Sequence, residues 1–160
     1  MVDIAIEKEP RTRRLKVYFD GGCRPNPGKI EVAVVARGVT YYFDDMGCGT
    51  STDAEWLALR AALTIAQRLG KTDFDLIGDN AGVIAQARGA SKCRSQSALD
   101  HLAKFAELAE AGGPRRLVWT SRNQNLAGIA LAGRRNSHSS VPPAGPPEAD
   151  GVDAQLQLSV

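Results

Sequence analysis

The chain has 160 residues, of which 43% are hydrophobic and 24% charged, and its formal net charge is +2. These values are typical of a single domain of ordinary size with one core, and they exclude a strong overall attraction to nucleic acids or membranes. No apolar run approaches the roughly 18 to 20 residues that span a bilayer, and the first residues lack the apolar core of a signal peptide.

The first predicted elements are strands. Residues 15–19 alternate apolar and polar side chains, as in a half-buried strand. The runs 31–37 and 39–45 flank Gly38 and predict two strands joined by a tight turn. The remaining expected elements are, in chain order, a helix at about 52–69, a strand at 73–78, a short helix from 80 to about 88, an amphipathic helix at 97–111, a strand at 116–120 and a helix at 125–133.

This order of elements predicts an α/β fold. Its mixed five-stranded sheet would combine an antiparallel meander with two parallel strands and carry helices on both faces. We expect an N-terminal extension at 1–13 and one folded domain at 14–134. Residues 135–160 are rich in Pro, Ser and Gly without periodicity, so a disordered C-terminal tail is expected there.

Glu55 is an unusual residue in the predicted long helix. Arg60, Thr64, Gln67 and Arg68 recur at helical spacing and predict a solvated stripe, and Glu55 points to the opposite, apolar side. A buried carboxylate is costly unless a cation or fixed hydrogen bonds hold it ionised. A capping box between Thr52 and Glu55 would explain the same residue, so two interpretations stay open here.

Asp20 and Asp79 each follow directly on a predicted apolar strand. If these strands are parallel neighbours joined by the long helix, both carboxylates and Glu55 meet at one edge of the sheet. Three such carboxylates repel one another by roughly 4 kcal/mol per pair at an effective dielectric near 20. A divalent cation would offset this, and hard oxygen ligands predict Mg²⁺ or Mn²⁺.

The cysteines predict little chemistry of their own. Cys23, Cys48 and Cys93 are not spaced as metal ligands, so we expect reduced thiols in a cytoplasmic protein. A nucleophilic Cys23 is disfavoured, because His101 and His138 are expected on a helix and in the tail, where neither would activate it.

Four motifs in these segments resemble the type 1 ribonuclease H family, and the resemblance covers roughly residues 15–133. They are FDGGCRPNPG (19–28), TSTDAEWLAL (50–59), LIGDN (76–80) and VWTSRNQNLAGIAL (118–131). The first three match the Asp, Glu and Asp metal-ligand motifs of the family in the correct order. Each motif is weak alone, and together they are fairly specific.

The resemblance implies a metal-dependent endonuclease that hydrolyses the RNA strand of RNA/DNA hybrids, leaving 5′-phosphate and 3′-hydroxyl ends. Two Mg²⁺ ions, with Mn²⁺ as a possible substitute, would be bound by Asp20, Glu55 and Asp79. The substrate-binding residues would read 2′-hydroxyl groups across the minor groove. They are expected to be Gly21, Gly22, Cys23, Asn26, Ser51 and Thr52. No membrane or obligate protein partner is implied, and a monomer is expected.

The sequence departs from the family in its last helix. The family usually has a fourth aspartate there, whereas this chain has Gly128, or Ile129 if no gap is allowed. We predict that Asn125 replaces it as a catalytic metal ligand, with weaker binding of the second ion and a preference for Mn²⁺. Helix capping by Asn125 is the alternative.

Two basic features of the family are also altered. The loop histidine is missing, and Arg122 lies near its place, where it can contact phosphate but cannot shuttle protons at neutral pH. Where some members have a basic helical protrusion, only Arg88, Lys92 and Arg94 occur, which predicts modest, salt-sensitive binding.

A second function of a different class is a nucleic-acid-binding module that keeps the fold with little catalysis. The three retained acids argue against it, because a pure binder of a polyanion should lose them. A relative of sugar or acyl kinases is disfavoured, since the chain is too short for a two-lobed architecture.

Overall fold

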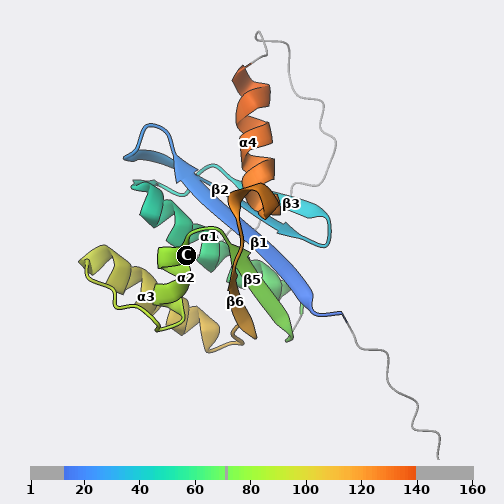
Figure 1. The fold of residues 1–160 in the computed structure, drawn as a ribbon, viewed down its shortest axis with the longest axis vertical. Coiled ribbons are helices and arrows are strands. Elements are labelled where there is room, and N and C mark those ends of the chain that lie inside the picture. Colours follow the sequence, from blue (N-terminus) through green and yellow to red (C-terminus); the bar gives the residue numbers. More distant parts are fainter. Residues whose placement is uncertain (1–12, 71, 140–160) are drawn as a thin grey trace, which may run out of the picture.

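The computed structural model describes residues 13–70 and 72–139, and Figure 1 shows its arrangement. The predictions for residues 1–12 and 140–160 fall outside the described residues. The elements are, in chain order, β1 (Leu15–Cys23), β2 (Gly28–Ala36), β3 (Val39–Phe43), β4 (Cys48–Gly49), α1 (Ser51–Arg68), β5 (Phe74–Gly78), α2 (Ala81–Ala87), α3 (Gln96–Ala109), β6 (Arg116–Trp119), the 3-10 helix η1 (Arg122–Gln124) and α4 (Leu126–Ser139).

The sheet has the strand order β3-β2-β1-β5-β6. Strands β1, β2 and β3 form the antiparallel meander, whereas β5 runs parallel to both β1 and β6. The mixed sheet predicted from the sequence is therefore confirmed. The structure adds β4, which has two residues and pairs with β2, and which is too short to produce a pattern in the sequence.

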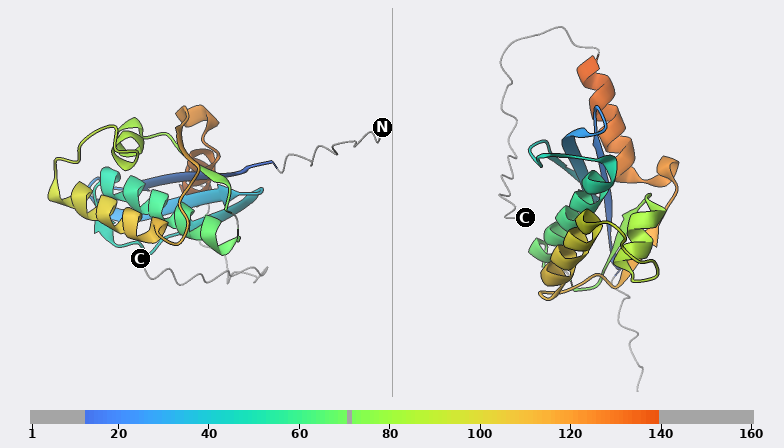
Figure 2. Two further views of the ribbon diagram at one scale, coloured as in Figure 1. Left: turned by 90° about the horizontal axis from the view of Figure 1, so that it is seen from below. Right: turned by 90° about the vertical axis from the view of Figure 1, so that its left-hand side faces the viewer.

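Helices cover both faces of this sheet, as predicted. Figure 2 shows α1 and α3 on one side of the strands and α4 on the other. In β1, Val17 and Phe19 pack into the core shared with α1. Tyr18 packs on the other face, against a smaller cluster formed by β2 and α4 that consists of Ala33, Val35, Ala127 and Leu131. Strand β2 is apolar on both faces because it is covered twice, which explains its nearly continuous hydrophobic run.

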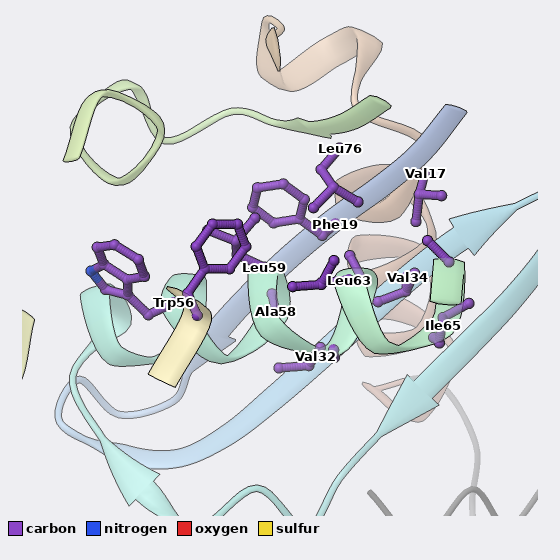
Figure 3. Close-up of a cluster of buried hydrophobic side chains, with 14 of the residues drawn as sticks. Val17, Phe19, Val32, Val34, Trp56, Ala58, Leu59, Leu63, Ile65 and Leu76 are labelled. Atoms are coloured by element: carbon purple, nitrogen blue, oxygen red, sulfur yellow. The ribbon is translucent and has the colours of Figure 1, made fainter. Parts of the chain in front are cut away.

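Helix α1 supplies more buried residues to the core than any other element of the described segments. Trp56, Leu59 and Leu63 are fully buried, and Figure 3 shows them in one cluster of buried side chains with Phe19 and Val34. Each fully buried side chain of this size contributes roughly 1.5 to 3 kcal/mol. The central helix is thereby held firmly against β1, the strand that carries Asp20.

The predicted solvated stripe of α1 is largely covered by α3. Arg60 is only 8% exposed, and its Nη1 lies 3.2 Å from His101 Nδ1. Gln67 donates hydrogen bonds to the carbonyl oxygens of Leu108 and Gly112, at the end of α3. The prediction was wrong for Arg60 and holds for the exposed Arg68, because polar residues that bind another helix have the same periodicity as residues that face water.

The start of α1 also differs from the prediction. Thr50 is the N-cap, and it forms a reciprocal capping box with Asp53, so the expected box between Thr52 and Glu55 does not form. Asp53 takes the capping role two residues earlier in the chain, and Glu55 is left without one.

Helix α4 is longer than the sequence predicts. It continues to Ser139, so the expected boundary between domain and tail, at 134/135, lies inside the helix. Arg134 donates to Asp44 and Arg135 to Glu31, and these ion pairs attach the second half of α4 to the β2–β3 side of the sheet. None of the helices in the described segments is long and apolar enough to cross a membrane.

Candidate metal centre

The register of the parallel strands brings Asp20 and Asp79 together. Tyr18 is paired with Ile77, so Asp20 and Asp79 each lie two residues further along β1 and β5. Asp79 directly follows β5, as predicted. Asp20 does not follow its strand, because β1 runs on to Cys23 and pairs Asp20 with Ala33 of β2. The carboxylate is thus fixed by a continuous strand and not by a loop.

Glu55 reaches the same place from the first turns of α1. The helix can approach β1 closely because residue 21 is a glycine. A Cβ atom on Gly21 would lie 2.2 Å from the carbonyl oxygen of Ala54, which no other residue could accommodate without backbone movement. Gly21 is therefore required by packing as well as by any ligand.

These three carboxylates converge. Asp20, Glu55 and Asp79 each offer one oxygen, and the three oxygens lie within 4.8 Å of one another. They border a cavity of about 530 Å³. Its lining residues are Asp20, Gly21, Ser51, Glu55, Asp79, Asn80, Arg122, Asn123, Gly128, Ile129, Ala132 and Arg135.

The electrostatics of the cluster favour a bound cation. Burial raises the pKa of Asp20, and repulsion by Asp79 raises it further. Burial likewise raises the pKa of Glu55, and the charges of Asp20 and Asp79 add to the effect, while Arg122 acts in the opposite direction. Without a cation, Asp20 and Glu55 therefore hold protons more tightly than isolated carboxyl groups do, and a divalent cation would compete with these protons.

The donor set fits a hard metal ion. Glu55 Oε2 is buried and has no hydrogen-bond partner among the described residues, so it is available as a ligand. Three convergent carboxylates without Cys or His are the ligands that Mg²⁺ and Mn²⁺ prefer. Asp20, Glu55 and Asp79 could hold such an ion.

Asn125 lies beside this cluster and is fully buried. Its Nδ2 donates to the Phe19 carbonyl oxygen at 3.0 Å and to Asp79 Oδ2 at 2.9 Å, and its Oδ1 accepts from Ala127 N–H at 3.2 Å. A carbonyl on one side and an N–H on the other decide the orientation of the amide. The oxygen predicted to bind metal is thus used within α4, which corresponds to the capping alternative, and the nitrogen holds Asp79.

Gly128 is the residue of α4 nearest to the acids. A Cβ atom there would lie 3.4 Å from Asp20 Oδ2 and 3.5 Å from Asp79 Oδ2. Ile129 borders the cavity but is 52% exposed. Position 128 is therefore where a fourth acidic side chain would join the cluster, in agreement with the local match and not with the gapless one.

The predicted substrate-binding residues differ in whether they border the cavity. Gly21, Ser51 and Arg122 border the cavity. Asn26 and Ser51 are joined by two hydrogen bonds, each of 3.1 Å, which tie the β1–β2 turn to the start of α1. The Cys23 side chain, by contrast, is 8% exposed and belongs to the hydrophobic core, so the structure does not present it to a ligand.

Two further predicted positions lie outside the cavity lining. Thr52 is exposed on the first turn of α1. Gly22 lies next to Arg135, since a Cβ atom on Gly22 would come within 2.7 Å of Arg135 Nη2.

Sequence reasoning missed Asn123, Ala132 and Arg135 as lining residues. Arg135 was assigned to the tail because Gly133 and the polar residues after it conceal the continuation of the helix. The spacing of Gly128, Ala132 and Arg135 is the available signal, because it places all three on one face of an unbroken helix.

Comparison with known proteins decides the family. Residues 19–135, which include all three acids, match the family described as "Reverse transcriptase-like". The chain belongs to this family. The resemblance to type 1 ribonucleases H is confirmed by this match together with a ribonuclease HI relative and RNase H1 structures of the same fold.

One curated relative is ribonuclease HI of Halobacterium salinarum, which is 37% identical over 95 residues. The match spans 54% of this chain and 46% of that protein, so the chain matches about half the length of this relative.

Solved structures show the same fold. The crystal structure of RNase H1 from Halobacterium salinarum matches with a TM-score of 0.70 and 29% identity, covering 79% of this chain and 99% of that one. The N-terminal RNase H domain of a Mycobacterium tuberculosis protein has a TM-score of 0.60 and 26% identity, covering 78% and 97%. LC11-RNase H1 in complex with RNA/DNA hybrid has a TM-score of 0.64 at 23% identity, covering 74% and 93%.

Proposed function

We propose that this protein is a ribonuclease H that hydrolyses the RNA strand of RNA/DNA hybrids. The observation that carries the proposal is the convergence of Asp20, Glu55 and Asp79 within 4.8 Å at an open cavity. The names of its relatives support the same activity, and one structure of similar fold was solved with a hybrid bound.

The proposed cofactor is Mg²⁺, with two ions per site and Mn²⁺ as a substitute. Bound ions would lower the pKa of the attacking water and stabilise the leaving 3′-oxygen, which yields 5′-phosphate and 3′-hydroxyl ends. Asp20, Glu55 and Asp79 would be the ligands. The proposal includes a monomer located in the cytoplasm, as expected from the sequence.

The other residues of the site act on geometry and substrate. Asn125 is proposed as a positioning residue, because its Nδ2 fixes one oxygen of Asp79 and leaves the other for a ligand. Arg122, on the cavity wall, is proposed to contact a phosphate. Backbone groups of Gly21 and Gly22, with Asn26, Ser51 and Thr52, remain the proposed contacts for the RNA strand.

A binding module with little catalysis is the second candidate. It is favoured by Gly128, which places no acidic side chain at the position facing Asp20 and Asp79. The three retained acids favour the enzyme.

A cleavage assay with a labelled hybrid distinguishes the two candidates. The wild type should cleave only the RNA strand in Mg²⁺ or Mn²⁺, and Asp79→Asn should abolish cleavage while leaving the thermal unfolding transition intact. Asp45→Asn, at an exposed aspartate outside the cavity, is the matched control and should cleave normally. A wild type that binds the hybrid but leaves it uncut in both metals would establish the binding module instead.

A further inference from the structure

Arg135 stands between two cavities. It borders the carboxylate cavity and also a neighbouring one of about 450 Å³ between α4 and the β2–β3 side of the sheet. The neighbouring cavity is lined by Arg24, Lys29, Glu31, Asp44, Leu131, Arg134 and Arg135. No other residue of the described segments appears in both linings.

The guanidinium group of Arg135 is held in place from one side. Its Nε donates to Glu31 Oε2 at 2.9 Å, and the side chain is 23% exposed. Nη2, however, is buried and has no hydrogen-bond partner among the described residues. A buried donor without an acceptor is costly, and such exceptions in folded proteins call for a specific explanation.

Small residues surround this guanidinium group. Residue 22 is a glycine, and a Cβ atom there would lie only 2.7 Å from Nη2. Gly128 and Ala132 lie on the same face of α4 as Arg135 and border the carboxylate cavity with it. Because both are small, a polymer strand can lie along this face from the carboxylates to the guanidinium group.

The charges of the neighbouring cavity suit an anion. Its two acids are engaged, since Glu31 pairs with Arg135 and Asp44 pairs with Arg134. Arg24 and Lys29 therefore add positive charge that these acids do not offset. Arginine is well suited to phosphate because its planar donors can bind a pair of oxygens, and Nε pairing with Glu31 leaves the terminal nitrogens for this role.

We infer that Arg135 is a substrate-binding residue, whose guanidinium group donates to a phosphate of the cleaved strand as that strand passes from the carboxylate cavity toward the basic cavity. This inference rests on the proposed function and names a contact that the acidic motifs do not include.

The first test measures hybrid binding without divalent metal, so that no cleavage occurs. Arg135→Ala removes one phosphate contact, so it should bind the hybrid about 10- to 100-fold more weakly than the wild type at low salt. It should also reduce the slope of log affinity against log salt by about 0.7 to 0.9. Arg115→Ala removes a 65% exposed arginine next to the start of β6, far along the strands from the acids, and should leave the slope unchanged.

The second test locates the contact. A panel of hybrids, each with one uncharged methylphosphonate linkage in the RNA strand, is bound to the wild type and to Arg135→Ala. One linkage at or next to the cleavage position should weaken binding by the wild type and have no additional effect on Arg135→Ala. An identical salt slope and an identical linkage pattern in the two proteins would overturn the inference.

A second variant guards against misfolding. Gly22→Ala crowds Nη2 without removing a charge, and it should reproduce the altered linkage pattern of Arg135→Ala. Failure of the proposed function has a separate signature. A wild type that binds through Arg135 but cleaves nothing refutes the enzyme and keeps the contact, whereas normal cleavage with an unaltered Arg135→Ala refutes the contact alone.

Discussion

Strand β5 carries an aspartate near each end, and the two are treated in opposite ways. Asp75 has a side chain that is 2% exposed, and it is bound by Arg116 at 2.8 Å and by Arg14 at 3.4 Å. Asp79, at the other end, meets Asp20 and Glu55. Burial would raise the pKa of Asp75, but hydrogen bonds and charge from Arg116, with support from Arg14, outweigh it and lower the pKa. At the other end, burial raises the pKa of Asp20 and Glu55.

The difference is between a carboxylate that is neutralised within the protein and carboxylates that are not. At Asp75 the protein itself supplies the cations, so the charge is stabilised without a ligand. At Asp20 and Glu55 the arginines of the cavity do not bring the pKa back to its ordinary value, and the site remains short of positive charge. Perturbed carboxyl groups in a cavity are a physical reason to expect a ligand.

The largest expected effect is the loss of a metal ligand. Glu55→Gln should lower the cleavage rate about 1000-fold or more, because several kcal/mol of transition-state stabilisation depend on the bound ions. Asp75→Asn removes the same amount of charge, but from β5 and away from the cavity, so its cleavage rate should remain within a fewfold of the wild-type rate. Single-turnover cleavage and calorimetric metal titration measure both. Comparable losses in the two variants would contradict the functional distinction.

Substitution of Asn125 tests how much cleavage depends on the position of the Asp79 carboxylate. Asn125→Ala should reduce cleavage about 10- to 100-fold through misplacement of Asp79. It should also destabilise the fold by roughly 1 to 3 kcal/mol, since the Phe19 carbonyl and the Ala127 N–H lose their partner.

Asn125→Asp separates positioning from ligation. It puts an acceptor against the Phe19 carbonyl and Asp79, so it should be no better than alanine in the cleavage assay. Increased activity with Asn125→Asp would show instead that a carboxylate at this position binds a metal ion and promotes cleavage.

Position 128 allows the acidic cluster to be enlarged. Gly128→Asp should tighten metal binding about tenfold, or 1.4 kcal/mol, because the new side chain starts beside Asp20 and Asp79. In the absence of metal the same variant should unfold at a lower temperature, since a further like charge is added. Melting temperatures of Gly128→Asp and the wild type, measured in EDTA and in Mn²⁺, check both effects. A shift of the same sign in the two conditions would refute the position of residue 128 beside Asp20 and Asp79.

The smallest effect concerns the dependence of stability on pH. The lowered pKa of Asp75 stabilises the fold above the ordinary value of about 4, and this contribution is lost as pH falls through the lowered pKa. Asp75→Asn should therefore cost roughly 1 to 2 kcal/mol at neutral pH, discounted for the exposure of its arginine partners, and flatten the acid side of the stability profile.

The acidic cluster should give the opposite slope. Because Asp20 and Glu55 hold protons more tightly in the folded chain, metal-free stability should fall as pH rises above about 4. Urea unfolding in EDTA across pH measures both slopes. Glu55→Gln should reduce the alkaline loss, and an unchanged profile would contradict the raised pKa.

The sequence alone determined the strand and helix order, the meander, and the three candidate acids, of which Asp20 and Asp79 follow apolar runs and Glu55 lies on the helix between them. These features follow from local periodicity and from the rule that parallel neighbours share one carboxyl edge. The burial of Glu55 beside the two aspartates could be predicted because a lone carboxylate on an apolar helix face is visible in the residue pattern itself.

Tertiary structure alone decided what lies around the acids. The sequence could not show that the Asn125 oxygen is used by Ala127, because the donor and acceptor sides of an amide depend on neighbours distant in the chain. Nor could it show that α4 continues past Gly133, since the residues there have weak helical patterning and are held by Glu31 of β2 and by Asp44, which follows β3. Local sequence patterns determine where helices and strands form. Contacts between segments about 90 to 100 residues apart determine which polar atoms reach the cavity.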